Sequence, residues 1–107
     1  MSLIRIVFLA ALAPALAQGA EGEILLTIKD HRFDPSEVRV PANQKVKLLV
    51  QNLDATAEEF ESHALNREKV IPGNSKAVLY VGPLSPGHYP FFGEFHEQTA
   101  KGVVIAE

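Results

Sequence analysis

Residues 37–50 read Glu37-Val38-Arg39-Val40-Pro41-Ala42-Asn43-Gln44-Lys45-Val46-Lys47-Leu48-Leu49-Val50 and contain two strand patterns with a break between them. Residues 37–40 alternate polar and apolar side chains, the period of a half-buried strand. Pro41-Ala42-Asn43 ends this pattern, because such residues favour turns. Residues 45–50 begin by alternating and end as an apolar run, which suits a strand that passes from an edge into the interior of a sandwich.

Similar runs lie on both sides of this segment, and no stretch shows a sustained helical period. Turn residues bound each run, and Asp34-Pro35-Ser36 reverses the chain before residue 37. The further runs are residues 23–29, 77–81, 87–92 and 102–106. Short strands at a spacing of roughly ten residues are typical of an all-β, antiparallel Greek-key β-sandwich or barrel.

Composition limits the classes of function. The chain has 107 residues, 47% of them hydrophobic, a formal net charge of −3 and no cysteine. This length supports one domain, and the charge provides no basic patch for nucleic acid. The absence of cysteine excludes disulfides, thiolate nucleophiles and iron–sulfur clusters. A bound metal would therefore need histidine, carboxylate or backbone oxygen ligands.

Residues 1–20 have the pattern of an export signal. An apolar run follows the single charge at Arg5, and Ala15-Leu16-Ala17 offers a small-residue cleavage pattern. We predict cleavage after Ala17 or Ala20, a mature domain over residues 21–107, and a periplasmic location. The apolar run is too short for a membrane anchor, so we expect no membrane insertion after cleavage.

Two segments between the predicted strands, residues 57–63 and 92–97, combine carboxylates with a histidine. If the first segment is extended, alternation puts Glu58 on the face of Phe60. A large aromatic in a small domain is usually buried, so Glu58 would point to the interior or its rim.

The remaining polar side chains of these segments follow the same alternation rule. Glu59, Glu61 and His63 would then face water on the opposite side of the strand. In the second segment the rule points Glu94 and His96 in the same direction.

The chain resembles the cupredoxins, and more narrowly the periplasmic cupredoxin-like proteins that accompany bacterial iron permease systems. The resemblance covers nearly all of the mature chain and rests on four stretches in the family's order: Ile28-Lys29-Asp30-His31-Arg32-Phe33-Asp34-Pro35, Val40-Pro41-Ala42-Asn43, Val50-Gln51-Asn52-Leu53-Asp54 and Gly87-His88-Tyr89-Pro90-Phe91-Phe92-Gly93-Glu94-Phe95-His96. It implies a Greek-key β-sandwich with converging loops at its metal-binding end. It also implies two partners, a periplasmic copper-binding iron-uptake protein and a membrane iron permease.

The departures from the blue-copper pattern concern the ligands. A blue-copper site uses two histidines, a cysteine and usually a methionine. On this sequence the pattern places the first histidine at Glu58, the cysteine at Gly93 and the methionine at Ala100, so that only His96 remains. The resemblance therefore excludes a blue-copper electron carrier. Imidazole and carboxylate instead suit ferrous iron, cupric copper, manganese or zinc.

We hypothesise a retooled site for a divalent metal ion, iron or copper. His96, Glu94 and Glu58 would form it, and Glu61 or His63 would complete it. The predicted function is metal binding in ferrous iron acquisition, with assistance to the oxidation or transfer of the ion rather than independent catalysis. Two alternatives stay open: a metal-free structural or interaction module of the same assembly, and a copper chaperone.

The other two histidines are predicted to have ordinary positions. His31 lies between charged residues at a turn, where a solvent-exposed or strand-end role is expected. His88 lies one strand length before His96, too far along an extended chain to share a ligand set with it.

Overall fold

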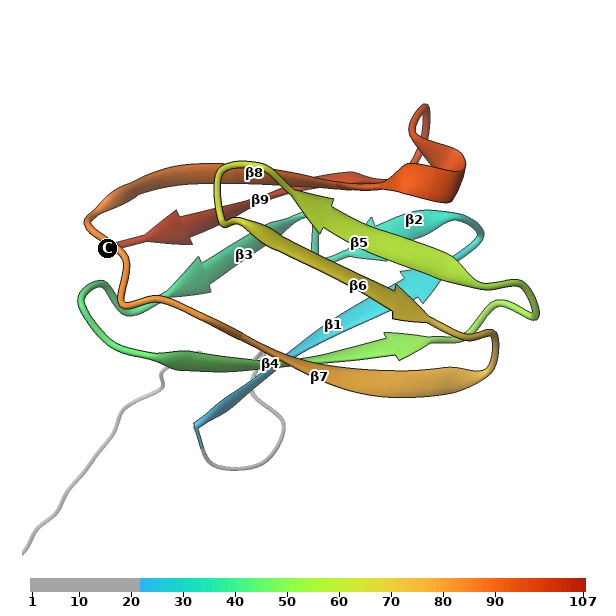
Figure 1. The fold of residues 1–107 in the computed structure, drawn as a ribbon, viewed down its shortest axis with the longest axis horizontal. Helices are drawn as coiled ribbons and strands as arrows, with labels where there is room; N and C mark the ends of the chain where they lie inside the picture. Colours follow the sequence, from blue (N-terminus) through green and yellow to red (C-terminus); the bar gives the residue numbers. More distant parts are fainter. Residues whose placement is uncertain (1–21) are drawn as a thin grey trace, which may run out of the picture.

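The computed structural model describes residues 22–107, which form two β-sheets packed face to face (Figure 1). One sheet has the order β2-β1-β4-β7, with β1 at Glu23–Lys29, β2 at Arg32–Asp34, β4 at Val46–Asn52 and β7 at Ser75–Val81. The other has the order β3-β9-β8-β5-β6, with β3 at Glu37–Val40, β5 at Glu58–Ser62, β6 at Arg67–Ile71, β8 at Gly87–Gly93 and β9 at Lys101–Ala106. A short 3₁₀ turn, η1 at Glu94–His96, follows β8.

The all-β sandwich predicted from the sequence is confirmed, and the six predicted strands correspond to β1, β3, β4, β7, β8 and β9. The predicted antiparallel arrangement holds for most strand pairs but not for all of them. The pairs β1–β4 and β3–β9 are parallel, because the chain crosses between the sheets before it returns beside an earlier strand. The assignment of residues 57–63 to a segment between strands is also wrong, since β5 and β6 form a hairpin there.

The core between the sheets contains three aromatic rings from three strands. Phe60 and Phe91 are stacked with centroids 4.9 Å apart, and Phe33 meets Phe91 edge to face at the same separation. Phe60 is fully buried, as predicted, and Glu58 on the same face of β5 is 1% exposed. Burial of a phenylalanine side chain contributes roughly 1.5–3 kcal/mol, so Phe60 fixes which face of β5 points inward.

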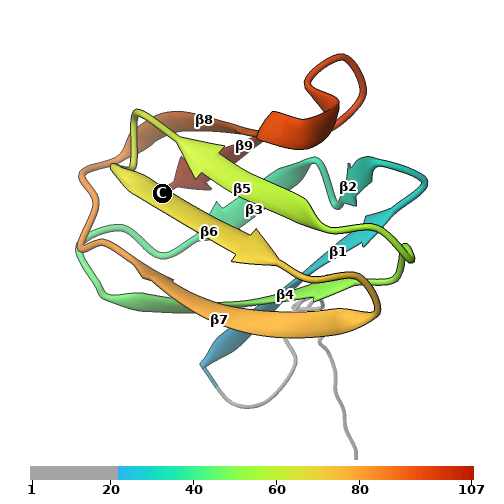
Figure 2. The ribbon, with the colours of Figure 1, turned by 45° about the vertical axis from the view of Figure 1, so that its right-hand side comes forward.

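The turn between β1 and β2 brings His31 to the end of the sandwich that carries η1 (Figures 1 and 2). Asp30 and His31 both have positive φ, at 53° and 57°, as in the two-residue turns that suit hairpins. The Asp54 carboxylate accepts hydrogen bonds from both of their amides, at 2.7 and 2.9 Å. This hydrogen bond from the His31 amide is the main factor that lowers the pKa of Asp54.

The predicted export signal lies outside the described residues. Within residues 22–107 there is no helix with the length and apolar character needed to cross a membrane.

Candidate metal centre

The five predicted metal ligands do not converge on one point, because β5 presents them on two faces. Glu58 points inward and lies near His96, whereas Glu61 points outward and lies near Glu94. His63 follows the end of β5, is exposed, and has its ring 5.8 Å from the ring of Phe92. The structure therefore contains an inner carboxylate–histidine pair and an outer group of carboxylates.

In the inner pair, hydrogen bonds within the protein occupy both oxygens of the Glu58 carboxylate. Glu58 Oε1 accepts from the amides of Glu59 and Phe95, both at 2.9 Å. Glu58 Oε2 lies 2.7 Å from Nδ1 of His96. Both oxygens of this buried carboxylate are engaged, which satisfies the requirement that a buried charge be hydrogen-bonded. Glu58 therefore ties β5 to the start of η1.

The positions of the blue-copper ligands do come together, but the residues present there do not fit a type 1 copper ion. A Cβ atom built on Gly93 would lie 2.6 Å from Cδ of Glu58 and 2.7 Å from Cβ of Ala100. The space of a cysteine side chain is thus filled by the Glu58 carboxyl group. Without a thiolate, and with both Glu58 oxygens engaged, the ligand set of a blue-copper centre is missing.

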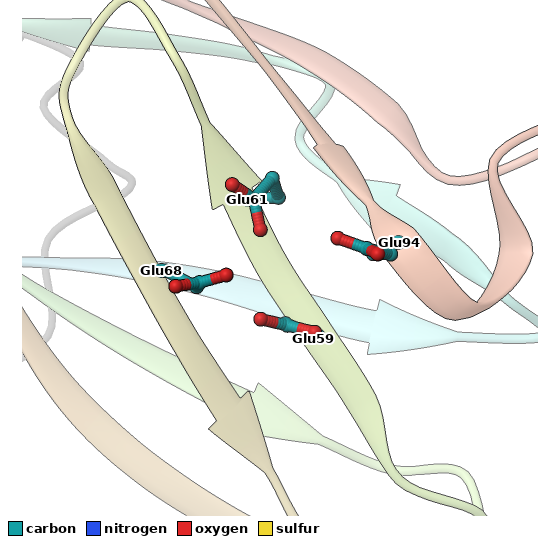
Figure 3. Close-up of side chains that lie close together, drawn as sticks. All are labelled: Glu59, Glu61, Glu68 and Glu94. Atoms are coloured by element: carbon teal, nitrogen blue, oxygen red, sulfur yellow. The ribbon is translucent and has the colours of Figure 1, made fainter.

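Four glutamates form the outer group, which we call the acidic cluster: Glu59 and Glu61 of β5, Glu68 of β6 and Glu94 of η1. One carboxylate oxygen from each lies within 4.8 Å of the others, and Figure 3 shows the four carboxyl groups pointing toward one another. Among the described residues, no lysine or arginine forms an ion pair with any of them. A shallow pocket lined by Glu61, Glu68 and His63 opens beside the cluster.

In the acidic cluster, the carboxyl group of Glu61 is the one whose hydrogen-bonding capacity is least satisfied. Its Oε1 is buried and has no hydrogen-bond partner in the described structure. Desolvation, followed by the neighbouring carboxyls of Glu68 and Glu94, raises the pKa of Glu61 to about 7. Desolvation and Glu68 also raise the pKa of Glu59. Such a carboxyl lacks a positive partner, which a bound cation would supply.

The prediction that Glu94 and His96 point the same way is wrong. Strand alternation does not apply to them, because the chain leaves β8 and enters the 3₁₀ turn η1. Within that turn Glu94 is exposed and joins the acidic cluster, while His96 reaches Glu58.

Sequence reasoning missed three residues that the fold brings to this end of the molecule. Glu59 was placed on the face of Glu61 but not among the ligands, although alternation pairs the two. Glu68 was missed because β6 was not predicted, yet it lies directly opposite Glu61 in the hairpin register. His31 was expected at a solvent-exposed or strand-end position, and its ring stacks on that of His96 with centroids 3.6 Å apart.

This arrangement of two sheets, with the loop after β8 at one end, defines a cupredoxin-type sandwich. A family model for the cupredoxin-like domain matches residues 2–106, and the chain belongs to that family. RP394 of Rickettsia prowazekii, described as an uncharacterized protein, is 47% identical over 83 residues, which is 78% of this chain. The match spans 66% of that relative's length, slightly less than two thirds.

Solved structures with the same fold include three copper proteins at low sequence identity. Auracyanin A, a blue copper protein of Chloroflexus aurantiacus, has a TM-score of 0.68 and 15% identity over 79% of this chain and 98% of its own. Amicyanin of Paracoccus versutus has a TM-score of 0.63 and 17% identity over 89% and 85%. The metal-binding domain of the Cu(I)-exporting ATPase CopA of Streptococcus pneumoniae, solved with Cu(I), has a TM-score of 0.71 and 14% identity over 85% and 92%. These likenesses establish the fold.

Proposed function

We propose that this chain is a periplasmic cupredoxin-like metal-binding protein without type 1 copper, which binds ferrous iron at the acidic cluster. It assists the oxidation or transfer of that ion in an iron uptake system. Its partners in this proposal are a periplasmic copper-binding iron-uptake protein and a membrane iron permease. The location and the partners follow from the sequence of residues 1–20 and from the family resemblance.

The buried, unpartnered Oε1 of Glu61, set among three other carboxylates, is the observation that carries this proposal. Carboxylate oxygens suit Mn²⁺, and they also ligate Fe²⁺, a borderline ion, in non-haem and di-iron carboxylate sites. With metal–ligand bonds of about 2 Å, two ligands on opposite sides of an ion lie about 4 Å apart. The 4.8 Å limit on the distances between the cluster oxygens is therefore only slightly wider than a coordination sphere.

The position of the acidic cluster also favours an ion that exchanges. Glu68 and Glu94 are exposed, so one side of the cluster faces solvent. A carboxylate set without imidazole or thiolate holds a divalent ion less firmly than the nitrogen- and sulfur-rich sites of permanent cofactors. Such a site is suited to accept an ion and release it to a partner.

The test is anaerobic calorimetry of the purified protein with Fe²⁺, compared with the variants Glu61→Gln and Glu97→Gln. Glu97 follows η1, is exposed and lies outside the acidic cluster, so its variant removes a carboxylate of the same segment. We expect one saturable site, weakened at least about tenfold by Glu61→Gln and unchanged by Glu97→Gln. Equal affinities in the wild type and Glu61→Gln would overturn the cluster as the site. No saturable binding by folded protein would favour the metal-free module.

A further inference from the structure

The outer face of the β2-β1-β4-β7 sheet lies on the opposite side of the sandwich from the acidic cluster (Figures 1 and 2). Core side chains alternate along its strands, so the side chains between them point outward. One outward row is apolar across three strands, because Leu25 of β1 pairs with Leu49 of β4, which pairs with Val78 of β7. Val78 is 38% exposed, and Tyr80 on the same face of β7 is 45% exposed. An outward sheet face that meets water is normally polar, so this row is unusual.

Basic side chains surround the apolar row, and we call the outward side chains of these four strands, together with Lys45, the basic face. Within residues 22–107, alternation and register place five basic and two acidic side chains on it: Lys29, Arg32, Lys45, Lys47 and Lys76 against Glu23 and Asp34. Nζ of Lys47 lies 3.3 Å from Oε2 of Glu23. Nζ of Lys45 lies 4.7 Å from the centroid of the Tyr80 ring. The basic face therefore combines exposed apolar side chains with an excess of positive charge.

The other sheet carries the opposite charge on its outer face. Its outward strand side chains include four glutamates and two basic residues: Glu37, Glu59, Glu61 and Glu68 against Arg39 and Lys101. The formal net charge of −3 does not reveal this separation. Packed sheets lie about 10 Å apart, and the Debye length is about 8 Å at physiological ionic strength. A negative surface in contact with the basic face is therefore largely screened from the carboxylates of the far sheet.

We propose that the basic face is a docking surface for a membrane of anionic phospholipid, such as phosphatidylglycerol. Lysine side chains keep their ammonium groups in the polar layer while their stems lie along apolar surface, so they can reach the lipid phosphates. Val78 and Tyr80 contact the layer below the headgroups, and tyrosine suits a boundary with one apolar and one wet side. The basic residues are spread over the strands of the sheet, which suits a plane of many phosphates better than a single acidic group. The acidic cluster then faces solvent.

The experiment measures binding of the purified protein to sedimented vesicles in a buffer with a metal chelator. One vesicle preparation is phosphatidylcholine alone, and the other contains equal parts of phosphatidylcholine and phosphatidylglycerol. We expect stronger binding to the anionic vesicles, and this excess should fall as salt is added, because salt screens the attraction. Every variant carries the same residues 1–21, so any contribution from them is equal throughout. Binding that does not increase with phosphatidylglycerol would overturn the proposal.

Two double variants with the same change in net charge assign the binding to one face. Lys45→Gln combined with Lys76→Gln removes two positive charges from the basic face and should weaken anionic vesicle binding at least about tenfold. Arg39→Gln combined with Lys101→Gln removes two positive charges from the other sheet and should have little effect. Equal weakening by the two double variants would show that net charge alone controls binding, and would overturn the basic face as the docking surface.

Val78→Glu and Val70→Glu form a second matched pair, since both valines are exposed in strands of opposite sheets. Val78→Glu puts a carboxylate into the apolar row and should abolish the excess binding to anionic vesicles. Val70→Glu, on the far sheet, should leave it unchanged. Circular dichroism checks that both variants are folded, and the lysine variants decide the outcome if Val78→Glu is not. Unchanged binding by folded Val78→Glu would contradict the proposal.

Sedimentation without vesicles tests a second copy of the chain as the occupant. Salt-sensitive self-association that both Lys45→Gln/Lys76→Gln and Glu68→Gln abolish, without vesicle binding, would assign the basic face to the acidic cluster of another copy and overturn the lipid proposal. The inference does not rest on the function proposed above. Glu61→Gln should bind vesicles as the wild type does, so a failure of Fe²⁺ binding and a failure of vesicle binding are separate results.

Discussion

The two faces of β5 carry glutamates with the same carboxyl group in opposite environments. On the inner face Glu58 is buried and has a partner for each of its oxygens. On the outer face Glu61 has a buried oxygen without a partner, and desolvation together with two carboxyl neighbours raises its pKa. The inner group therefore stabilises the fold, and the outer group is held in an environment that favours a cation. The two faces differ in their hydrogen-bond donors. On the inner face η1 supplies donors to the Glu58 carboxylate, whereas on the outer face Oε1 of Glu61 has no donor.

The largest expected effect is the removal of the inner carboxylate. Glu58→Ala leaves the amides of Glu59 and Phe95, and Nδ1 of His96, without their acceptor. Loss of the acceptor from such a buried group should lower the free energy of unfolding by roughly 3–5 kcal/mol, measured by urea denaturation. Glu37→Ala, on the exposed face of β3, should stay within about 0.5 kcal/mol of the wild type. A small effect of Glu58→Ala would mean that the inner carboxylate is replaceable by water.

The second effect concerns the space that the Glu58 carboxyl occupies. Gly93→Ala places a Cβ 2.6 Å from Glu58 Cδ, so we expect a loss of about 1–3 kcal/mol in the free energy of unfolding. Gly87→Ala is the matched control in the same strand, because the nearest atom to its Cβ lies at 3.6 Å. It should be neutral or slightly stabilising.

A double-mutant cycle sharpens this prediction. Removal of the Glu58 side chain vacates the space that the new Cβ needs, so Gly93→Ala should cost less in the Glu58→Ala background. We expect a coupling energy of at least about 0.5 kcal/mol. Strictly additive effects would show that Ala100, the other close neighbour of that Cβ, is the real obstacle.

The contrast between the faces was partly predictable from the sequence. Phe60 fixes the inward face of β5, and simple alternation then separates Glu58 from Glu59 and Glu61. The remaining members of each group depend on long-range geometry. Glu68 enters through the register of a hairpin whose second strand is exposed at four of its five positions and begins with three polar residues, which gives no periodic apolar signal.

The same limit applies to the histidines. The positive φ of His31 and the 3₁₀ turn at His96 are set by tertiary hydrogen bonds that the carboxylates of Asp54 and Glu58 accept. Strand alternation therefore misplaced Glu94 relative to His96, and nothing in the local sequence predicts that His31 stacks on a ring 65 positions away.

The third prediction concerns the pH dependence of stability on the outer face. The pKa of Glu61 is raised from 4.5 to about 7, so the folded protein holds this proton more tightly than the unfolded chain. The free energy of unfolding should therefore fall as pH rises between these two values, and the loss should persist above them. Glu61→Gln cannot ionise and lacks this contribution. Its urea midpoint should decrease less than that of the wild type between pH 4.5 and pH 8; parallel curves would contradict the assignment.

The smallest expected effect is that of Glu68→Gln, which removes one negative charge directly opposite Glu61 in the β5–β6 register. Like charges at facing positions destabilise a hairpin, so this variant should be slightly more stable than the wild type at pH 8. The gain should shrink as salt is added, because Glu68 is exposed and its repulsion is screened. The same variant should bind Fe²⁺ more weakly, since it loses a ligand of the acidic cluster. If Glu68→Gln is more stable than the wild type and also binds Fe²⁺ more weakly, the charge repulsion on the outer face is a loss of stability that accompanies ion binding. If Glu68→Gln is instead less stable than the wild type and its affinity for Fe²⁺ is unchanged, Glu68 has a structural role, as Glu58 does.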